Sequence, residues 1–241
     1  LKVVNQNPLG SAAGYGSSFP INRTFTTQEL GFATLKFNSV AAQMSRGKSE
    51  KTVAFAMSSV AATLAKFSMD VCLYMSQNFD FISLPAHLTT GSSIMPHKKN
   101  PDVFELIRGK CNKIQALPYE ITLITNNLPS GYHREFQLLK EGLFPAIQNL
   151  KACLDIAIFS IKDIKVKDNI LADPKYNYLF TVDTLNEMVV AGMPFRDAYK
   201  AVAEQLENGT YESPKATQHT HEGSINNLCL KEIKEKMQNA F

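Results

Sequence analysis

Apolar residues at helical spacing dominate the first two thirds of the chain. They are densest between residues 49 and 78, at Val53, Ala56, Met57, Val60, Leu64, Phe67, Val71, Leu73 and Met75. This spacing predicts one helix, on the order of 40 Å long at about 1.5 Å per residue. Because most of its circumference is apolar, we expect it inside a helical bundle or at a subunit interface.

The same pattern predicts further helices and few strands. Two are long, over residues 102–127 with a kink at Pro118, and over residues 135–161 with Pro145 near the start or at a bend. Shorter helices are expected from a Thr26 or Thr27 cap to Leu30, and over residues 180–191, 194–208 and 230–241. The predicted fold is therefore all-α. A long-helix bundle domain covers residues 1–163 and includes the loop 89–101, and a small helical domain covers residues 164–241.

Composition narrows the function classes. The 241 residues carry 25 basic and 22 acidic side chains, a net charge of +3, which is too balanced to indicate nucleic acid or a membrane surface as a partner. The longest apolar stretch, residues 52–79, contains Lys66 and Asp70, so no uncharged membrane span is predicted. The four cysteines are far apart in the chain, which indicates reduced thiols in a cytosolic protein. The first residue, Leu1, suggests a fragment, a processed chain or missing leading sequence.

The loop before residue 102 contains the most distinctive chemistry. Gly91 permits a tight turn, Asn100 is a good N-cap, and Pro101 suits the first position of a helix. Asp102 and Glu105 favour the positive end of that helix.

Positive charge and hydroxyl groups gather beside this predicted helix terminus. A helix N-terminus attracts anions, Lys98 and Lys99 add charge, and Ser92 and Ser93 supply hydroxyls. The residues alone therefore indicate either an anion site with a candidate base or nucleophile, or a basic surface loop.

The run Gly-Ser-Ser-Ile-Met-Pro-His-Lys-Lys-Asn-Pro, from Gly91 to Pro101, resembles the signature of the fumarase, aspartase and argininosuccinate lyase superfamily. The flanking residues 102–108, and residues 7–11, 20–23 and 192–198, are similar to the argininosuccinate lyase branch. His97 departs from that branch, which more often carries Gln at this position. Adenylosuccinate lyases carry Met-Pro-His, and this keeps them as an alternative.

The resemblance implies a reaction and the residues that perform it. A base removes a proton from the carbon beside a carboxylate, the carbanion is held as an aci-carboxylate, and elimination gives arginine and fumarate. Ser92 matches the base, which needs nearby positive groups to stabilise its alkoxide. Lys98 and Asn100 match the groups that stabilise the intermediate, and Glu105 matches a carboxylate that orients the family's catalytic histidine. No cofactor and no metal are implied.

Other positions match groups that bind the substrate, argininosuccinate. Tyr132, Gln137 and Lys140 resemble a cluster that holds its carboxylates, and Ser93 and Asn100 belong to the loop side of the site. Arg46 matches a substrate-binding arginine, although Met44-Ser45 replaces the family's Ser-Asp before it. Gly10 and Ser11 are expected to frame a neighbouring loop.

The family's catalytic histidine follows a threonine in a motif that we do not find in this sequence. Thr220-His221 has the right dipeptide but the wrong flanks, so His219 and His221 are predicted to be exposed loop residues. The resemblance also implies a missing N-terminal segment of the same protein, a cytoplasmic homotetramer whose sites combine several subunits, and little activity from this chain alone. A non-catalytic helical structural or oligomerisation protein of the same fold is the alternative of another class.

Overall fold

The computed structural model describes residues 1–214 and 219–240, and it confirms the all-α prediction. The chain divides into two compact units, Leu1–Lys167 and Asp168–Phe241, whereas the sequence suggested a boundary after residue 163. Strands are minimal in the described residues. The parallel pair is β1 (Gln6–Asn7) with β2 (Thr34–Leu35), and the antiparallel pair is β3 (Ile82–Ser83) with β4 (Lys165–Val166).

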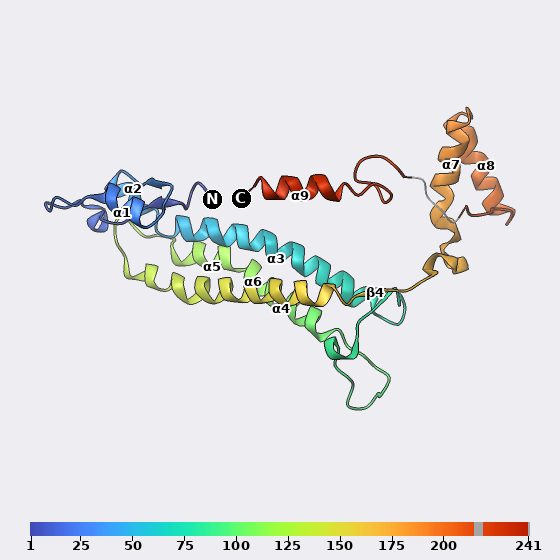
Figure 1. Cartoon of the computed structure of the whole chain (residues 1–241), viewed down its shortest axis with the longest axis horizontal. Helices are drawn as coiled ribbons and strands as arrows, with labels where there is room; N and C mark the ends of the chain where they lie inside the picture. Colours follow the sequence, from blue (N-terminus) through green and yellow to red (C-terminus); the bar gives the residue numbers. More distant parts are fainter. Residues whose placement is uncertain (215–218, 241) are drawn as a thin grey trace. The chain divides into compact units, whose positions relative to one another are not determined.

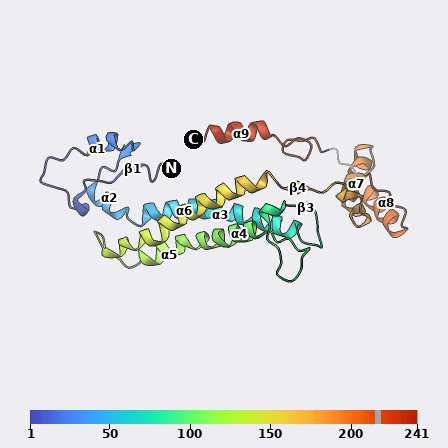
Figure 2. The ribbon, with the colours of Figure 1, turned by 60° about the horizontal axis from the view of Figure 1, so that its bottom comes forward.

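Four helices build the bundle of the first unit (Figures 1 and 2). They are α3 (Lys48–Tyr74), α4 (Asp102–Gln115), α5 (Leu117–Ile124) and α6 (Leu139–Ile161), and α3 packs against all three others. Their buried faces form one core, whose largest fully buried side chains include Phe104, Ile107, Ile121 and Leu139.

The two longest predicted helices differ from the structure at their ends. The helix predicted over residues 49–78 ends at Tyr74, where Phe81 N–H donates to the Tyr74 carbonyl (2.9 Å) and turns the chain back. The helix predicted over residues 102–127 is two helices that meet at Ala116. Pro118 lies in the first turn of α5, where its missing N–H costs least, so the expected kink is a break between helices. Pro145 lies within α6.

Residues before the bundle are more structured than a loop. They include a 3-10 turn (Ala12–Gly14), α1 (Arg23–Glu29) and α2 (Ser39–Met44), of which α2 was not predicted. The predicted Thr26 or Thr27 cap is wrong, because the Asn22 side chain accepts from Phe25 N–H (2.9 Å) one turn earlier. Thr27 is instead inside the helix and accepts a hydrogen bond from buried Asn7 (2.9 Å).

The long helices expose much of their apolar surface in the single chain. Two segments, Lys48–Tyr74 and Arg134–Ile161, are long and apolar enough to cross a membrane by length and composition alone, although each window allows up to two charges. This evidence is weak, because core helices of soluble bundles meet the same criterion. Only 33% and 28% of these windows are buried here, so both helices retain apolar faces for further contacts.

The second unit is smaller. It comprises two 3-10 turns (Ile170–Ala172 and Pro174–Phe180), α7 (Thr181–Val190), α8 (Phe195–Glu207) and α9 (Leu230–Gln238), close to the three predicted short helices. Leu185, Ala198 and Val202 form its buried core.

All four cysteines, Cys72, Cys111, Cys153 and Cys229, are free thiols, as the sequence indicated. Cys111 and Cys153 are buried where α4 meets α6. Burial, together with the neighbouring Cys153, raises the pKa of Cys111 to about 12. This thiol therefore stays protonated near neutral pH and contributes to packing.

Candidate active site

The Gly91–Pro101 loop precedes α4 and projects away from the bundle helices (Figure 1). Backbone hydrogen bonds close it at its base. A short 3-10 turn, Ala86–Leu88, precedes it. Thr90 and Asn100 form an antiparallel bridge, with Thr90 N–H donating to Asn100 O (3.1 Å) and Asn100 N–H to Thr90 O (2.8 Å). The Thr90 hydroxyl also donates to the Asp102 carboxylate. The two ends of the loop are therefore held together.

Two expectations about this loop are wrong. Asn100 is not the N-cap of the following helix, because its backbone pairs with Thr90, and α4 begins one step later with Pro101 as the cap. Gly91 has no positive φ, and a Cβ added to it would meet nothing within 4 Å. The turn therefore does not require glycine at this position.

Ser92 is held in a defined hydrogen-bonding environment. Its Oγ lies 3.1 Å from Met95 N and 3.3 Å from Ile94 N, and both backbone amides donate to it. Donors directed at one oxygen favour its negatively charged form, so these amides can stabilise a serine alkoxide. Ser92 itself is half-buried, whereas Ser93 is exposed.

A cavity of about 760 Å³ lies between this loop and the end of α3. Lys98, Asn100 and Glu105 contribute to its lining. The other charged side chains around it are Lys99, Lys167 and Asp80, and the last two form an ion pair. Basic groups exceed acidic groups here, so the cavity favours an anionic ligand.

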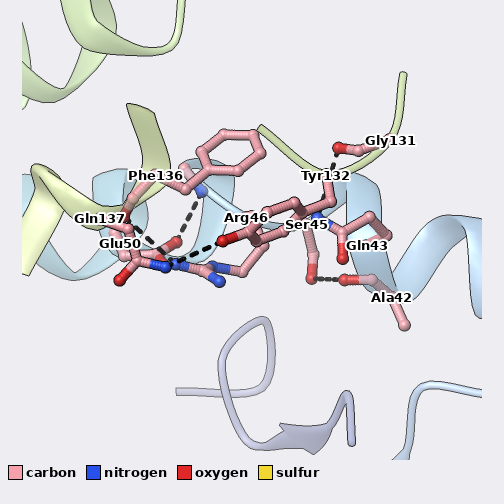
Figure 3. A network of polar contacts seen from close by, with 10 residues as sticks. Ala42, Gln43, Ser45, Arg46, Glu50, Gly131, Tyr132, Phe136 and Gln137 are labelled. Carbon is pink, nitrogen blue, oxygen red and sulfur yellow. Dashed lines mark hydrogen bonds and ion pairs between the residues drawn. The ribbon is translucent and has the colours of Figure 1, made fainter. Parts of the chain in front are cut away.

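The other group of predicted residues lies where α3 begins (Figure 3). Arg46 Nε donates to Glu50 Oε1 (3.1 Å), and Arg46 Nη2 donates to the Phe136 carbonyl (3.4 Å). The guanidinium also lies over the Phe136 ring, 5.5 Å from its centroid. Arg46 is thus restrained by Glu50 in the first turn of α3 and by the 3-10 turn Arg134–Gln137.

Tyr132 and Gln137 lie next to this arginine (Figure 3). Gln137 Nε2 donates to the Tyr132 hydroxyl (3.1 Å), and both side chains are exposed. Lys140 follows in the first turn of α6 and is exposed too. Gln43 Nε2 donates to the Gly131 carbonyl (3.3 Å) and ties this segment to α2.

Sequence reasoning did not identify Glu50. The available signal was its position three residues after Gly47, the N3 position, from which a glutamate can accept from the N-cap backbone N–H. Its second oxygen accepts from Gly47 N–H (2.7 Å).

The two groups of predicted residues lie at opposite ends of one helix. Arg46 immediately precedes α3, and the loop cavity is lined by Cys72, Met75 and Ser76 at the other end. The 27 residues of α3 separate them by about 40 Å. A small molecule cannot contact both groups within one chain.

The histidines do not supply a partner for Ser92 in the part of the chain that the structure describes. His97 lines the loop cavity, and His133 lies against Phe136 at the other end. His219 and His221 are exposed, as expected, and His219 pairs with Asp183 (2.7 Å) in the second unit.

Known proteins with similar sequences and folds indicate which family the chain resembles. The family model described as "Lyase" matches residues 1–116. An argininosuccinate lyase from Parabacteroides distasonis is 58% identical over 240 residues, which cover 100% of this chain and 54% of that protein. An argininosuccinate lyase from Bacteroides fragilis is 56% identical over 237 residues, covering 98% and 53%.

These matches make the chain similar over nearly its whole length to argininosuccinate lyases, in agreement with the resemblance of the Gly91–Pro101 loop. It spans about half the length of the curated relatives that it matches. Solved structures share the fold. EDDS lyase in complex with formate has a TM-score of 0.67 at 24% identity, covering 85% of this chain and 42% of that chain. A class II fumarase from Schistosoma mansoni has a TM-score of 0.70 at 18% identity, covering 97% and 52%.

Proposed function

We propose that this protein is an argininosuccinate lyase, which splits argininosuccinate into arginine and fumarate in arginine biosynthesis. The observation that carries the proposal is the Ser92 hydroxyl, which accepts two backbone hydrogen bonds in a loop whose next residues line a basic cavity. The relatives at 56–58% identity have this activity by name, which supports this substrate over others in the superfamily.

The reaction needs a base at the carbon next to a carboxylate. Ser92 Oγ takes the proton, and the Ile94 and Met95 amides stabilise the alkoxide that must form first. The electron pair of the C–H bond moves into the carboxylate, where Lys98 and Asn100 stabilise the added negative charge. The C–N bond then breaks, its electron pair leaves with nitrogen, and an acid protonates that nitrogen. Glu105 at the start of α4 orients the histidine that performs this last step.

The substrate carboxylates bind at the other group of residues, Arg46, Tyr132, Gln137 and Lys140. Arginine and lysine supply positive charge, and the tyrosine and glutamine supply directional hydrogen bonds. Because α3 separates this group from Ser92 by about 40 Å, the two groups must meet across different chains. We therefore propose a cytoplasmic homotetramer in which the exposed apolar faces of α3 and α6 are buried between subunits.

The substrate is tested by following fumarate release from the natively assembled protein with argininosuccinate and with adenylosuccinate. Turnover of argininosuccinate alone supports the proposal. Turnover of adenylosuccinate instead would favour the alternative that His97 suggests. Absence of fumarate from both would favour a non-catalytic helical protein. The 241-residue chain assayed alone is expected to release little fumarate, because it spans about half of its relatives.

A further inference from the structure

Arg46, whose side chain is 32% exposed, is held by two hydrogen bonds and one aromatic contact. A guanidinium has five N–H donors. One, on Nε, is used by Glu50 and one, on Nη2, by the Phe136 carbonyl. The Phe136 ring stacks below the plane at 5.5 Å. The remaining donors, including both on Nη1, have no hydrogen-bond partner among residues 1–214 and 219–240.

Glu50 is the anchor of this arrangement. Its side chain is only 19% exposed, and each of its oxygens accepts one hydrogen bond. Oε1 accepts from Arg46 Nε (3.1 Å), and Oε2 accepts from the Gly47 amide (2.7 Å). The carboxylate therefore fixes the arginine side chain relative to the backbone at the start of α3.

Gly47, whose N–H donates to Glu50, is itself held by close packing. Gly47 has φ +79°, and a Cβ added there would lie 2.5 Å from Thr125 Cγ2. The start of α3 is thus packed directly against the end of α5. Glu50 thus links the guanidinium, which lies near Tyr132 and Gln137 (Figure 3), to this packed backbone.

We propose that Glu50 is a positioning residue, which holds Arg46 with its free N–H edge toward a carboxylate of the substrate. This inference rests on the proposed function, because that function assigns the carboxylate to Arg46. Fixing the guanidinium in advance removes the entropy cost of ordering it when the substrate binds. A neighbouring carboxylate also lowers the net charge of the pair, so the gain comes from geometry and not from added attraction.

The test is Glu50→Gln in the natively assembled protein, with fumarate release as the assay. The amide replaces one of the two accepting oxygens by an NH2 donor, so either Arg46 Nε–H or Gly47 N–H then faces a donor in place of its acceptor. The expected result is a rise in KM of about tenfold with kcat reduced less than about threefold, because binding geometry and not the base is disturbed. The matched control is Glu120→Gln, an exposed first-turn glutamate of α5, which is expected to leave both constants within about twofold.

A double variant separates positioning from a purely structural role. If Glu50 acts through Arg46, adding Glu50→Gln to Arg46→Lys raises KM less than about twofold further, because the effects are coupled. The inference would be overturned if the rise in KM of the double variant equalled the product of the two single rises, or if Glu50→Gln alone left KM unchanged.

A separate binding measurement distinguishes failure of the proposed function from failure of the role of Glu50. If the wild-type protein releases no fumarate, calorimetric titration with fumarate as the probe still tests the pair. Glu50→Gln is then expected to weaken fumarate binding about tenfold relative to wild type and to Glu120→Gln. Equal fumarate affinity in the three proteins would overturn the role of Glu50.

Discussion

The two ends of the bundle hold their polar side chains in different ways. At the loop end, Ser92 is held by amides two and three residues away, and the loop is closed by its own ends. At the arginine end, Arg46 and Gln43 bond to residues 90 and 88 positions away in the chain. The loop end is thus built from local hydrogen bonds on an exposed segment, and the arginine end from long-range packing. The proposed base therefore lies on a segment held by few contacts, and the proposed substrate-binding arginine is restrained by contacts with distant parts of the chain.

The largest expected effect is at the loop end. Ser92→Ala removes the oxygen that takes the proton, so kcat for fumarate release is expected to fall by about 10³-fold or more. The fold should persist, because Ser92 lies outside the buried core. Ser18→Ala, an exposed serine before α1, is the matched control. Near wild-type turnover by Ser92→Ala would contradict its assignment as the base.

Lys98→Met tests the positive charge beside that base. Loss of the charge that stabilises the aci-carboxylate is expected to lower kcat by about 10²-fold, with a smaller change in KM, in steady-state assays. The control Lys234→Met, at an exposed position on α9, removes a lysine without touching the loop or the bundle helices. Equal behaviour of the two variants would show that Lys98 is only a surface lysine.

The glycines give a comparison in stability. Gly47→Ala is strained by φ +79° and by contact with Thr125, so it is expected to reduce the free energy of unfolding by about 1–3 kcal/mol. Gly91→Ala has open space and ordinary φ, so its change is expected within about 0.5 kcal/mol. Denaturant titration of both variants measures the difference. Similar losses would mean that the loop end is packed as tightly as the arginine end.

A smaller effect is expected from Arg46→Lys. Lysine keeps the charge but loses the planar fork that Glu50 and the Phe136 carbonyl restrain. KM is expected to rise about tenfold while kcat changes little, as measured by initial rates. An unchanged KM would show that no substrate carboxylate binds this arginine.

Features of the fold that depend on local interactions could be predicted from the sequence. Apolar spacing identified the bundle helices, and the loop motif identified Ser92 with its charged neighbours. Errors occurred where short polar side chains compete to cap a helix, as with Asn22 against Thr26, and at Asn100, whose backbone pairs with Thr90. Glu50 was missed although its two hydrogen bonds are local, because glycine at position 47 is not one of the Ser or Thr residues by which a capping box is recognised in a sequence.

The separation of the two ends also could not be read from the sequence motifs. Arg46 and Ser92 were expected in one site, yet the straight run of α3 keeps them apart in a single chain. The resemblance implied sites that combine several subunits, and the length of α3 gives the physical reason: any site that uses both residues would have to take them from different chains.

Mixed assembly of two inactive variants tests this central claim most directly. Ser92→Ala carries a native arginine end, and an Arg46→Ala, Gln137→Ala double variant carries a native loop end. If each site takes its two ends from different chains, random co-assembly should restore about a quarter of the wild-type fumarate release, because a quarter of the sites then contain both native ends. Activity no higher than that of the separate variants, in assemblies verified to contain both chains, would contradict the account.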